Sequence, residues 1–333
     1  MSTVKISDVA KAANVSSATV SRVLSNSDTV RPATREHVLA VMKKLNYQPN
    51  ALAQQLRTQA TKTAIVIVPD IRNLLFHEVI NGIEAEAASS GYQVLLADMH
   101  GQPSVESYYV SAVQRRQVDG IISMSANMTQ KLLSQIAGEY PIVMALQGFD
   151  SPSIPFVSID NAAAARTMTA HLVKLGHRKI AHISGSAPLP YQERLNSYRA
   201  VLEENGIPFS EALVGRGEAS IRGGYTQMKA MLERGEDFTA VFAAGDTMAI
   251  GAIQALQEAG RRVPQDCAVA GFDDIELSSV LSPKLTTIRQ PTFQIGQQSF
   301  KMLLSLMKKE PVPSTHVVLP HELVIRDSCG YWL

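Results

Sequence analysis

Residues 6–24 read ISDVAKAANVSSATVSRVL, a stretch in which small apolar residues recur at helical spacing on both sides of a turn. A first helix is expected over about 6–13, and the Asn14-Val15 pair forms the turn. Ser16 then supplies a hydroxyl that can accept from free backbone N–H groups, which predicts a second helix reaching about residue 24. The apolar residues available to pack inward from this second helix are Ala18, Val20, Val23 and Leu24.

A third helix is expected to begin at Pro32, whose fixed φ suits the first helical position. Two helices joined by a turn of about four residues, with a third in support, are typical of a helix-turn-helix. In such a motif the second helix lies in the DNA major groove. Base edges would then be contacted by Ser17, Ala18 and Arg22, and phosphates by Thr19 and Ser21. The alternative is a three-helix bundle that binds no DNA.

The basic charge of the chain is concentrated at its start. Residues 1–62 hold nine Lys and Arg but three Asp and Glu, a net charge of +6, whereas the remainder carries −5. A basic segment on a mildly acidic chain favours contact between that segment and a polyanion, although a solvated charged surface would give the same count.

Length and composition set the broad class. With 333 residues, the chain is expected to form two or three domains of about 150 residues. An apolar content of 45% supports packed cores, and no apolar run approaches the ~20 residues that a membrane span requires. Two cysteines exclude a disulfide framework, and the N-terminus shows no secretory signal. We therefore expect a soluble cytoplasmic protein with no membrane partner.

From Thr63 onward, apolar runs typical of buried strands alternate with helical patterns. The run Ala64–Val68 precedes a helix over about 76–89, and a further strand is expected at about 92–97. Five more apolar runs follow, at 120–123, 142–145, 180–183, 240–243 and 268–272. Repeated strand–helix–strand units predict parallel sheets with helices on both faces, and about 270 residues exceed one such sheet. We therefore expect two doubly wound α/β subdomains with a ligand cleft between them.

Several short blocks of residues stand in a fixed order along the chain. Those in the first 50 residues are Asp8-Val9-Ala10, Val15-Ser16, Thr19–Leu24, Thr34-Arg35 and Leu45–Asn50. Those further on include Gln117–Gly120, Ile159-Asp160-Asn161, His171–His177, Gly245–Ala252 and Gly271–Asp274. Together they resemble the LacI/GalR family of bacterial transcription repressors over about residues 4–326. The blocks Ile67–Ile71 and Thr286–Pro291 are most similar to its cytidine-repressor branch.

The resemblance implies a domain organisation. A small all-α helix-turn-helix DNA-binding domain would occupy residues 1–46 and a hinge residues 47–61. An α/β body similar to periplasmic binding proteins would occupy residues 62–333, where it would bind an effector and dimerise. Its N-subdomain would comprise about 62–160 and 291–322, and its C-subdomain about 161–290 and 323–333.

The resemblance also implies which residues contact DNA. Residues 53–58 are similar to hinges that fold into a short helix on operator DNA, where paired leucines wedge into the minor groove. Leu56 is the matching position, and the cost of unstacking a base step is offset by contacts to the bent DNA. The full set of candidate DNA-binding residues is Ser16, Ser17, Ala18, Thr19, Ser21, Arg22, Asn50, Gln54 and Leu56. Lys5 departs from the family, because a capping Thr usually stands there, and losing such a cap costs about 1 kcal/mol.

Positions in the part of the chain after residue 62 match effector-contacting positions of the family. A ligand rich in hydroxyls needs donors and carboxylate acceptors at fixed positions, with an aromatic face beside them. The candidate effector-binding residues are Leu75, Phe76, Tyr191, Arg194, Asp273 and Gln290. Core packing is the alternative for Phe76, and a helix-capping turn is the alternative for Asp274. We expect Asp246 to cap the helix that follows it.

The identity of the effector stays open at this point. Ala219 stands where many relatives carry an aromatic lid, so Tyr191 is a substitute candidate for that face. A sugar, a sugar derivative and a nucleoside all remain compatible with the sequence.

The sequence contains no constellation typical of catalysis. It lacks a glycine-rich phosphate loop after the first strand and a Gly-x-Ser-x-Gly elbow, and His171, His177 and His182 are not spaced as metal ligands on one helix face. We expect no enzyme activity, no metal and no cofactor. The expected function is repression of transcription by a homodimer, without a leucine-heptad tail, that binds a pseudo-palindromic operator and a small-molecule effector. The alternative is a solute-binding protein without a DNA role.

Overall fold

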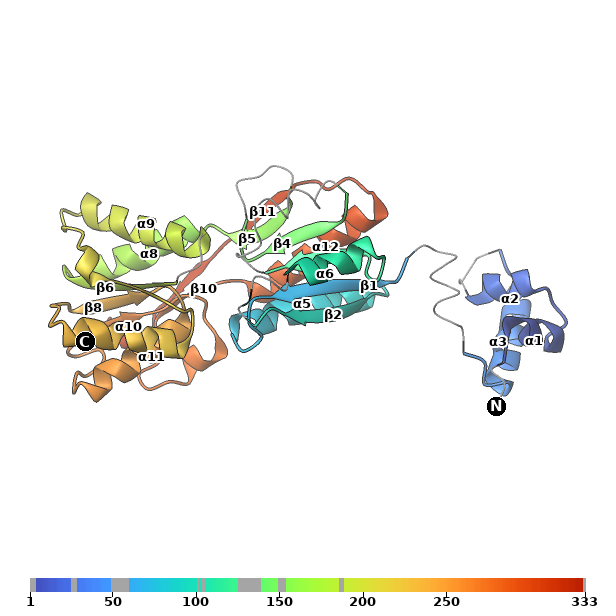
Figure 1. Cartoon of the computed structure of the whole chain (residues 1–333), viewed down its shortest axis with the longest axis horizontal. Coiled ribbons are helices and arrows are strands. Elements are labelled where there is room, and N and C mark those ends of the chain that lie inside the picture. Colours follow the sequence, from blue (N-terminus) through green and yellow to red (C-terminus); the bar gives the residue numbers. More distant parts are fainter. Residues whose placement is uncertain are drawn as a thin grey trace. The chain divides into compact units, whose positions relative to one another are not determined.

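The computed structural model describes residues 4–24, 29–48, 60–100, 102, 106–124, 139–148, 154–185 and 189–331. Contacts divide the chain into two compact units, residues 1–61 and 62–333. We call the first the head and the second the body, and describe each by itself (Figure 1).

The head contains the three helices that the sequence predicts: α1 (Ile6–Ala12), α2 (Ser17–Leu24) and α3 (Pro32–Lys44). Ser16 Oγ accepts from the backbone N–H of Thr19 at 3.1 Å, which confirms the predicted start of the second helix. Pro32 occupies the first turn of α3. The buried residues of the head are small or flexible: Val9, Ala10, Ala13, Val20, Val23, Val38 and Met42.

The first helix begins without a capping side chain at Lys5, as the sequence implies. The carboxylate of Asp8 instead accepts from the backbone N–H of Lys5 at 2.8 Å. One exposed backbone donor is thereby satisfied, so the start of α1 retains half of a reciprocal capping arrangement.

A six-stranded sheet forms one part of the body, with the order β11-β5-β4-β3-β1-β2 and parallel pairing throughout. Its strands are β1 (Thr63–Val68), β2 (Gln93–Asp98), β3 (Gly120–Ser123), β4 (Ile142–Ala145), β5 (Phe156–Ile159) and β11 (His316–Leu319). The helices associated with it are α5 (Leu75–Ser89), α6 (Glu106–Gln114) and α12 (Thr292–Lys308). Val66 belongs to one hydrophobic cluster and its neighbours Ile65 and Ile67 to another, so β1 is covered on both faces.

A four-stranded parallel sheet, in the order β7-β6-β8-β9, forms the other part of the body (Figure 1). Its strands are β6 (Ile180–Gly185), β7 (Val214–Gly217), β8 (Ala240–Ala243) and β9 (Ala268–Ala270). Its helices are α8 (Asn161–Lys174), α9 (Leu189–Glu204), α10 (Ile221–Glu233) and α11 (Asp246–Glu258). The prediction of a helix-turn-helix joined to an α/β body with two parallel sheets is therefore confirmed.

Two short strands, β10 (Thr287–Arg289) and β12 (Glu322–Val324), pair in antiparallel fashion. In the sequence, β10 is followed by α12 and β12 is preceded by β11. Both α12 and β11 belong to the part of the body that contains the six-stranded sheet. Three 3₁₀ turns complete the described elements, at Glu211–Leu213, Glu276–Ser279 and Asp327–Cys329.

Candidate functional sites

The predicted DNA-contacting residues of α2 share an exposed surface. Ser17, Ala18 and Arg22 are exposed, and Thr19 and Ser21 are half-buried. Ser16, at the start of the helix, is also exposed. The helix therefore presents short polar side chains, one methyl group and one guanidinium, which are the groups that can meet base edges and phosphates.

The prediction that Ala18 packs inward is wrong. Val20 and Val23 fill the inner face of α2, and a residue two positions from Val20 lies about 200° around a helix from it. Ala18 is therefore directed outward, on the same side as Arg22, four residues later. Asn50, Gln54 and Leu56 lie outside the residues that the structure describes.

In the body, the structure brings Arg194, Asp273 and Gln290 together. Arg194, on α9, is 4% exposed, and its Nη1 lies 3.9 Å from Asp273 Oδ1. Gln290 donates from Nε2 to the same Asp273 oxygen at 2.7 Å. Gln290 Oε1 is buried and has no hydrogen-bond partner among the described residues. We call Arg194, Asp273 and Gln290 the polar triad.

The guanidinium of Arg194 is held by groups that sequence reasoning missed. Nε and Nη2 both donate to Asn161 Oδ1, at 3.0 and 2.8 Å, and Nη1 donates to the Ala244 carbonyl at 2.5 Å. Its Cζ lies 3.5 Å from the ring centroid of Phe272. Asn161 and Phe272 fall in sequence blocks that resemble the family. This resemblance is the one sequence feature that could have indicated a role for them.

The remaining candidate effector residues have different surroundings. Tyr191 is half-buried on α9, and its ring centroid lies 5.6 Å from Arg194 Cζ. Leu75 and Phe76 form the first turn of α5, where the Leu75 N–H donates to Asn73 Oδ1. Phe76 is 7% exposed and belongs to the hydrophobic core, as its packing alternative predicts.

Asp246 does not cap α11, so that prediction is wrong. Gly245 occupies the capping position, and the buried Asp246 carboxylate points to another segment. It accepts from three donors, Thr287 Oγ1 at 2.6 Å, Ser278 Oγ at 2.7 Å and the Ile275 N–H at 3.0 Å. Asp246 therefore fixes the loop that carries Asp273.

The capping alternative for Asp274 is also wrong. Its Oδ2 accepts from Arg289 Nε at 2.7 Å, and Oδ1 lies 2.6 Å from Arg326 Nη2. Asp273 and Asp274 have φ values of 121° and 56°, both in the left-handed region. Because L side chains avoid this region, the surrounding contacts must hold the loop in place.

Burial dominates the electrostatics of this group. It raises the pKa of Asp273, while the Arg194 charge and the Gln290 hydrogen bond act in the opposite direction. It also raises the pKa of Asp246, reinforced by the neighbouring Asp273. For Arg194, burial lowers the pKa and the charge of Asp273 opposes it. The polar triad thus combines donors and acceptors that are partly stripped of water, where hydrogen bonds to a ligand count most.

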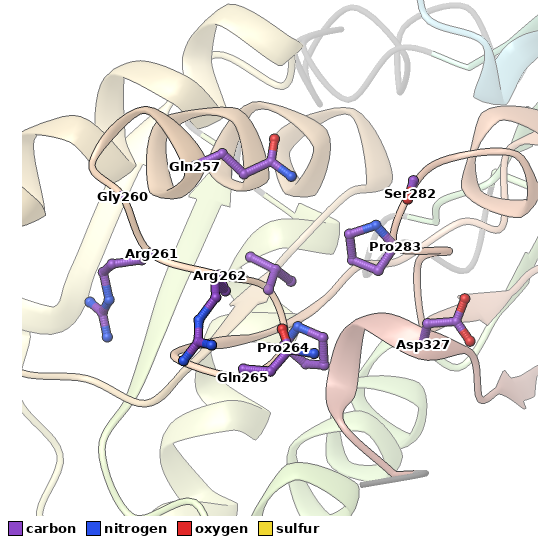
Figure 2. A pocket seen from close by; sticks show the side chains of 10 residues that line it. Gln257, Gly260, Arg261, Arg262, Pro264, Gln265, Ser282, Pro283 and Asp327 are labelled. Carbon is purple, nitrogen blue, oxygen red and sulfur yellow. The ribbon is translucent and has the colours of Figure 1, made fainter.

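A cavity of about 570 Å³ opens elsewhere in the body, and Figure 2 shows its lining. It lies beside the end of α11 and the loops at 260–265 and 282–283, and no residue of the polar triad lines it. The two arginines at its edge serve local contacts. Arg262 Nε donates to Asp266 at 2.8 Å, and Arg261 Nη2 donates to the Phe238 carbonyl at 2.8 Å. Both guanidinium groups at this cavity are therefore already engaged within the body.

Two features are absent from the part of the chain that the structure describes. No helix there is long and apolar enough to cross a membrane. No group of three or more His, Cys, Asp or Glu side chains there is arranged to hold a metal ion.

Comparison with known proteins covers both units. Residues 5–50 match the family described as bacterial regulatory proteins, lacI family, and residues 169–329 match a periplasmic binding protein-like domain. Catabolite control protein A of Priestia megaterium is 36% identical over 328 residues, which cover 98% of this chain and 99% of that protein. The HTH-type transcriptional repressor CytR of Escherichia coli strain K12 is 35% identical over 323 residues, covering 96% and 95%.

Solved structures show the same similarity. The lac repressor dimer bound to operator and the anti-inducer ONPF matches with a TM-score of 0.87 and 32% identity, covering 98% of this chain and 99% of that one. A complex of the transcriptional regulator CelR with cellobiose matches with a TM-score of 0.74 and 30% identity, covering 98% and 99%.

Proposed function

Because this chain belongs to the LacI family of bacterial regulatory proteins, we propose that it represses transcription by binding a pseudo-palindromic operator as a dimer. The observation that carries this proposal is the full-length similarity to the lac repressor dimer on its operator, which covers 98% of the chain. The similarity covers both the helix-turn-helix and the α/β body. The chain therefore resembles a regulator that has both of these domains. The cytoplasm is the proposed location of such a DNA-binding regulator.

In the head, α2 is proposed to enter the major groove. Arg22 is the residue best able to specify sequence, since a guanidinium can donate two hydrogen bonds to guanine. Ser17 and Ala18 would contact bases beside it, and Ser16, Thr19 and Ser21 would contact phosphates. The proposed hinge, residues 47–61, would add Asn50 and Gln54 as polar contacts and Leu56 as a minor-groove wedge.

In the body, the polar triad is proposed to bind the effector. The orphan oxygen of Gln290 and the Asp273 carboxylate can accept from hydroxyls, and Arg194 can donate to a ligand oxygen. Phe272 and Tyr191 flank the guanidinium with aromatic faces, and Leu75 is proposed as an apolar contact. A ring that carries adjacent hydroxyls fits these groups, and this chemistry is shared by sugars, sugar derivatives and nucleosides.

Effector control follows from coupling between the two sites. A ligand that changes how the two parts of the body pack would alter the spacing of the paired hinges. A coupling of about 1–3 kcal/mol would shift operator affinity, and operator would shift effector affinity by the same factor. No catalytic role is proposed, since the named relatives are regulators.

The proposal is tested by binding the purified chain to genomic fragments that include its own upstream region, at two salt concentrations. We expect selective binding that weakens at higher salt, because phosphate contacts release counterions. Arg22→Ala should reduce the preference for operator over random DNA by about 1–3 kcal/mol.

The rival function is a solute-binding protein without a DNA role, favoured by the periplasmic binding protein-like match over residues 169–329. It predicts no selective binding under any condition, including after addition of cellobiose, ribose or cytidine as trial co-repressors. Equal affinity of wild type and Arg22→Ala for a selected operator would remove α2 from the proposed interface.

A further inference from the structure

Lys62 is tied to the body at the point where the head ends. It is the first residue of the body and follows Thr61 in the chain. Its backbone N–H donates to Asp119 Oδ2 at 2.9 Å, and its carbonyl accepts from the Gln93 N–H at 2.8 Å. Its φ of 54° is left-handed, a conformation that a non-glycine residue keeps only where its surroundings hold it. The backbone of Lys62 is therefore held in place by the body.

The side chain of Lys62 makes a further contact with an aromatic residue. Its Nζ lies 4.4 Å from the ring centroid of Tyr92. Tyr92 is buried, and its ring meets that of Phe300 edge to face, with centroids 5.8 Å apart. We call Lys62, Tyr92 and Phe300 the junction cluster.

The junction cluster is attached to two closely packed helices. Tyr92 follows the end of α5, and Phe300 lies within α12. A Cβ on Gly82 of α5 would lie 2.1 Å from a carbonyl oxygen of α12, and one on Gly296 of α12 would lie 2.1 Å from a carbonyl oxygen of α5. The backbones of α5 and α12 therefore approach closely, and a displacement of one helix disturbs its contact with the other.

The same helix pair begins beside the polar triad. α12 starts two residues after Gln290, which is bonded to Asp273. The helices run parallel, because Gly82 meets the region of residue 293 and Glu86, one turn later, pairs with Lys301 at 3.7 Å. Their first turns therefore lie at one end of the pair, and Tyr92 lies beyond the other end of α5.

We propose that Lys62, through its cation–π contact with Tyr92, is a positioning residue that couples the polar triad to the hinge. This inference rests on the proposed function. A ligand that moves Gln290 displaces the start of α12. The α5–α12 pair carries this displacement to Tyr92 and Phe300, and Lys62 passes it to the adjoining hinge residues. The connection is a continuous chain of packed side chains and rigid helices.

The test uses the full chain at saturating concentration of an operator duplex selected from genomic fragments. The readout is backbone hydrogen exchange of residues 271–290 with and without operator. Since coupling is reciprocal, operator binding must change the triad segment if the triad controls operator binding. Lys62→Met, which keeps the aliphatic stem, should reduce the operator-induced change in exchange by about two- to fivefold, the equivalent of a partly exposed cation–π contact. Lys62→Arg should restore it, because a guanidinium also stacks on aromatic rings.

Matched variants distinguish a loss of coupling between the polar triad and the hinge from a general effect of a lost charge or of misfolding. Lys229→Met removes another Lys–Tyr contact of the body, in which Nζ lies 5.9 Å from the Tyr225 centroid, and should change nothing. Tyr92→Phe keeps the ring and should keep the coupling, whereas Tyr92→Leu should lose it.

Two results would overturn the inference while leaving the proposed function intact. One is a wild-type response in Lys62→Met, and the other is an operator-bound wild type with unchanged exchange at residues 271–290. Failure of the wild type to bind any duplex selectively would instead reject the proposed function, and this inference with it.

Discussion

The head and the body place their candidate functional residues in opposite environments. In the head, the candidates that the structure describes lie on α2 or directly before it and are exposed or half-buried, above a core built from alanine, valine and one methionine. In the body the polar triad is itself buried, within a unit whose core includes fully buried Tyr198, Phe242 and Phe300.

These two environments make each unit sensitive to a different kind of substitution. Contact with DNA needs an exposed charged surface, so the head can carry it on a minimal core that is only marginally stable. Buried polar groups cost desolvation free energy unless every partner is present, so the body needs a large core around its triad. Surface changes should therefore affect function in the head, and interior polar changes should affect it in the body.

The largest effect is expected for Arg194→Ala in the body. The change leaves Asn161 Oδ1 and the Ala244 carbonyl without their buried donor and Asp273 without its nearest cation. We expect a loss of about 3–5 kcal/mol in the free energy of unfolding, measured by urea titration, and loss of the effector response. Operator binding by the folded, effector-free variant should match wild type.

Arg199→Ala is the matched control, because Arg199 lies on the same helix but is exposed and pairs with Glu203. Its Cζ also lies 4.8 Å from the Phe209 ring centroid, so Arg199→Ala should leave the effector response unchanged and lower the free energy of unfolding much less than Arg194→Ala does. Calorimetry that showed Arg194→Ala binding the identified effector as tightly as wild type would falsify the assignment of the triad.

A pair of methionine truncations compares the two cores directly. Met42 and Met228 are both buried, one in the head and one in the body. Either change to alanine should cost about 2–5 kcal/mol of its unit's stability. We expect Met42→Ala to abolish operator binding at 25 °C while effector binding persists, and Met228→Ala to retain both. If Met42→Ala bound operator normally, the head would be more stable than its core suggests.

Much of the architecture follows from local sequence. Ser16 and Pro32 mark helix starts through backbone chemistry that needs no distant partner, and both positions agree with the structure. The long apolar strands were equally clear, although the second begins at Gln93 rather than Tyr92. Strands β5, β7, β10, β11 and β12 were not predicted. Two glycines interrupt β7, β10 and β12 each contain a charged residue, and β5 and β11 each contain a polar one.

The site was harder to predict, because its bonds join distant segments. Asp246 stands at the start of a helix and therefore suggests a cap, yet its partners Thr287 and Ser278 lie more than 30 residues away. Asn161 shows no sign in the sequence of its bond to Arg194, 33 residues later. The resemblance supplied Arg194, Asp273 and Gln290, whereas only the fold shows what holds them.

The smallest expected effect concerns pH. Burial and the nearby Asp273 raise the pKa of Asp246 to about 8, so the folded state keeps a proton that the unfolded state has lost. Stability then falls as pH rises from the ordinary Asp range toward 8. Burial also lowers the pKa of three histidines, His171, His177 and His182. As pH falls through the ordinary histidine pKa of about 6.5, the unfolded state takes up these protons first, so stability is lost.

The histidine effect fades only about one pH unit above the ordinary histidine pKa, so between about pH 7.5 and 8 the carboxylate effect is the larger of the two. We expect the free energy of unfolding to be higher at pH 7.5 than at pH 8, by at most about 1.4 kcal/mol per pH unit, because one group contributes that slope. Asp246→Asn should flatten this dependence, whatever its effect on stability at a single pH. Asp237→Asn, an exposed carboxylate paired with Lys179 whose pKa is lowered, should keep the wild-type slope. Equal slopes in wild type and Asp246→Asn would show that the buried carboxylate is ionised in the folded body, held by its three donors rather than by a proton.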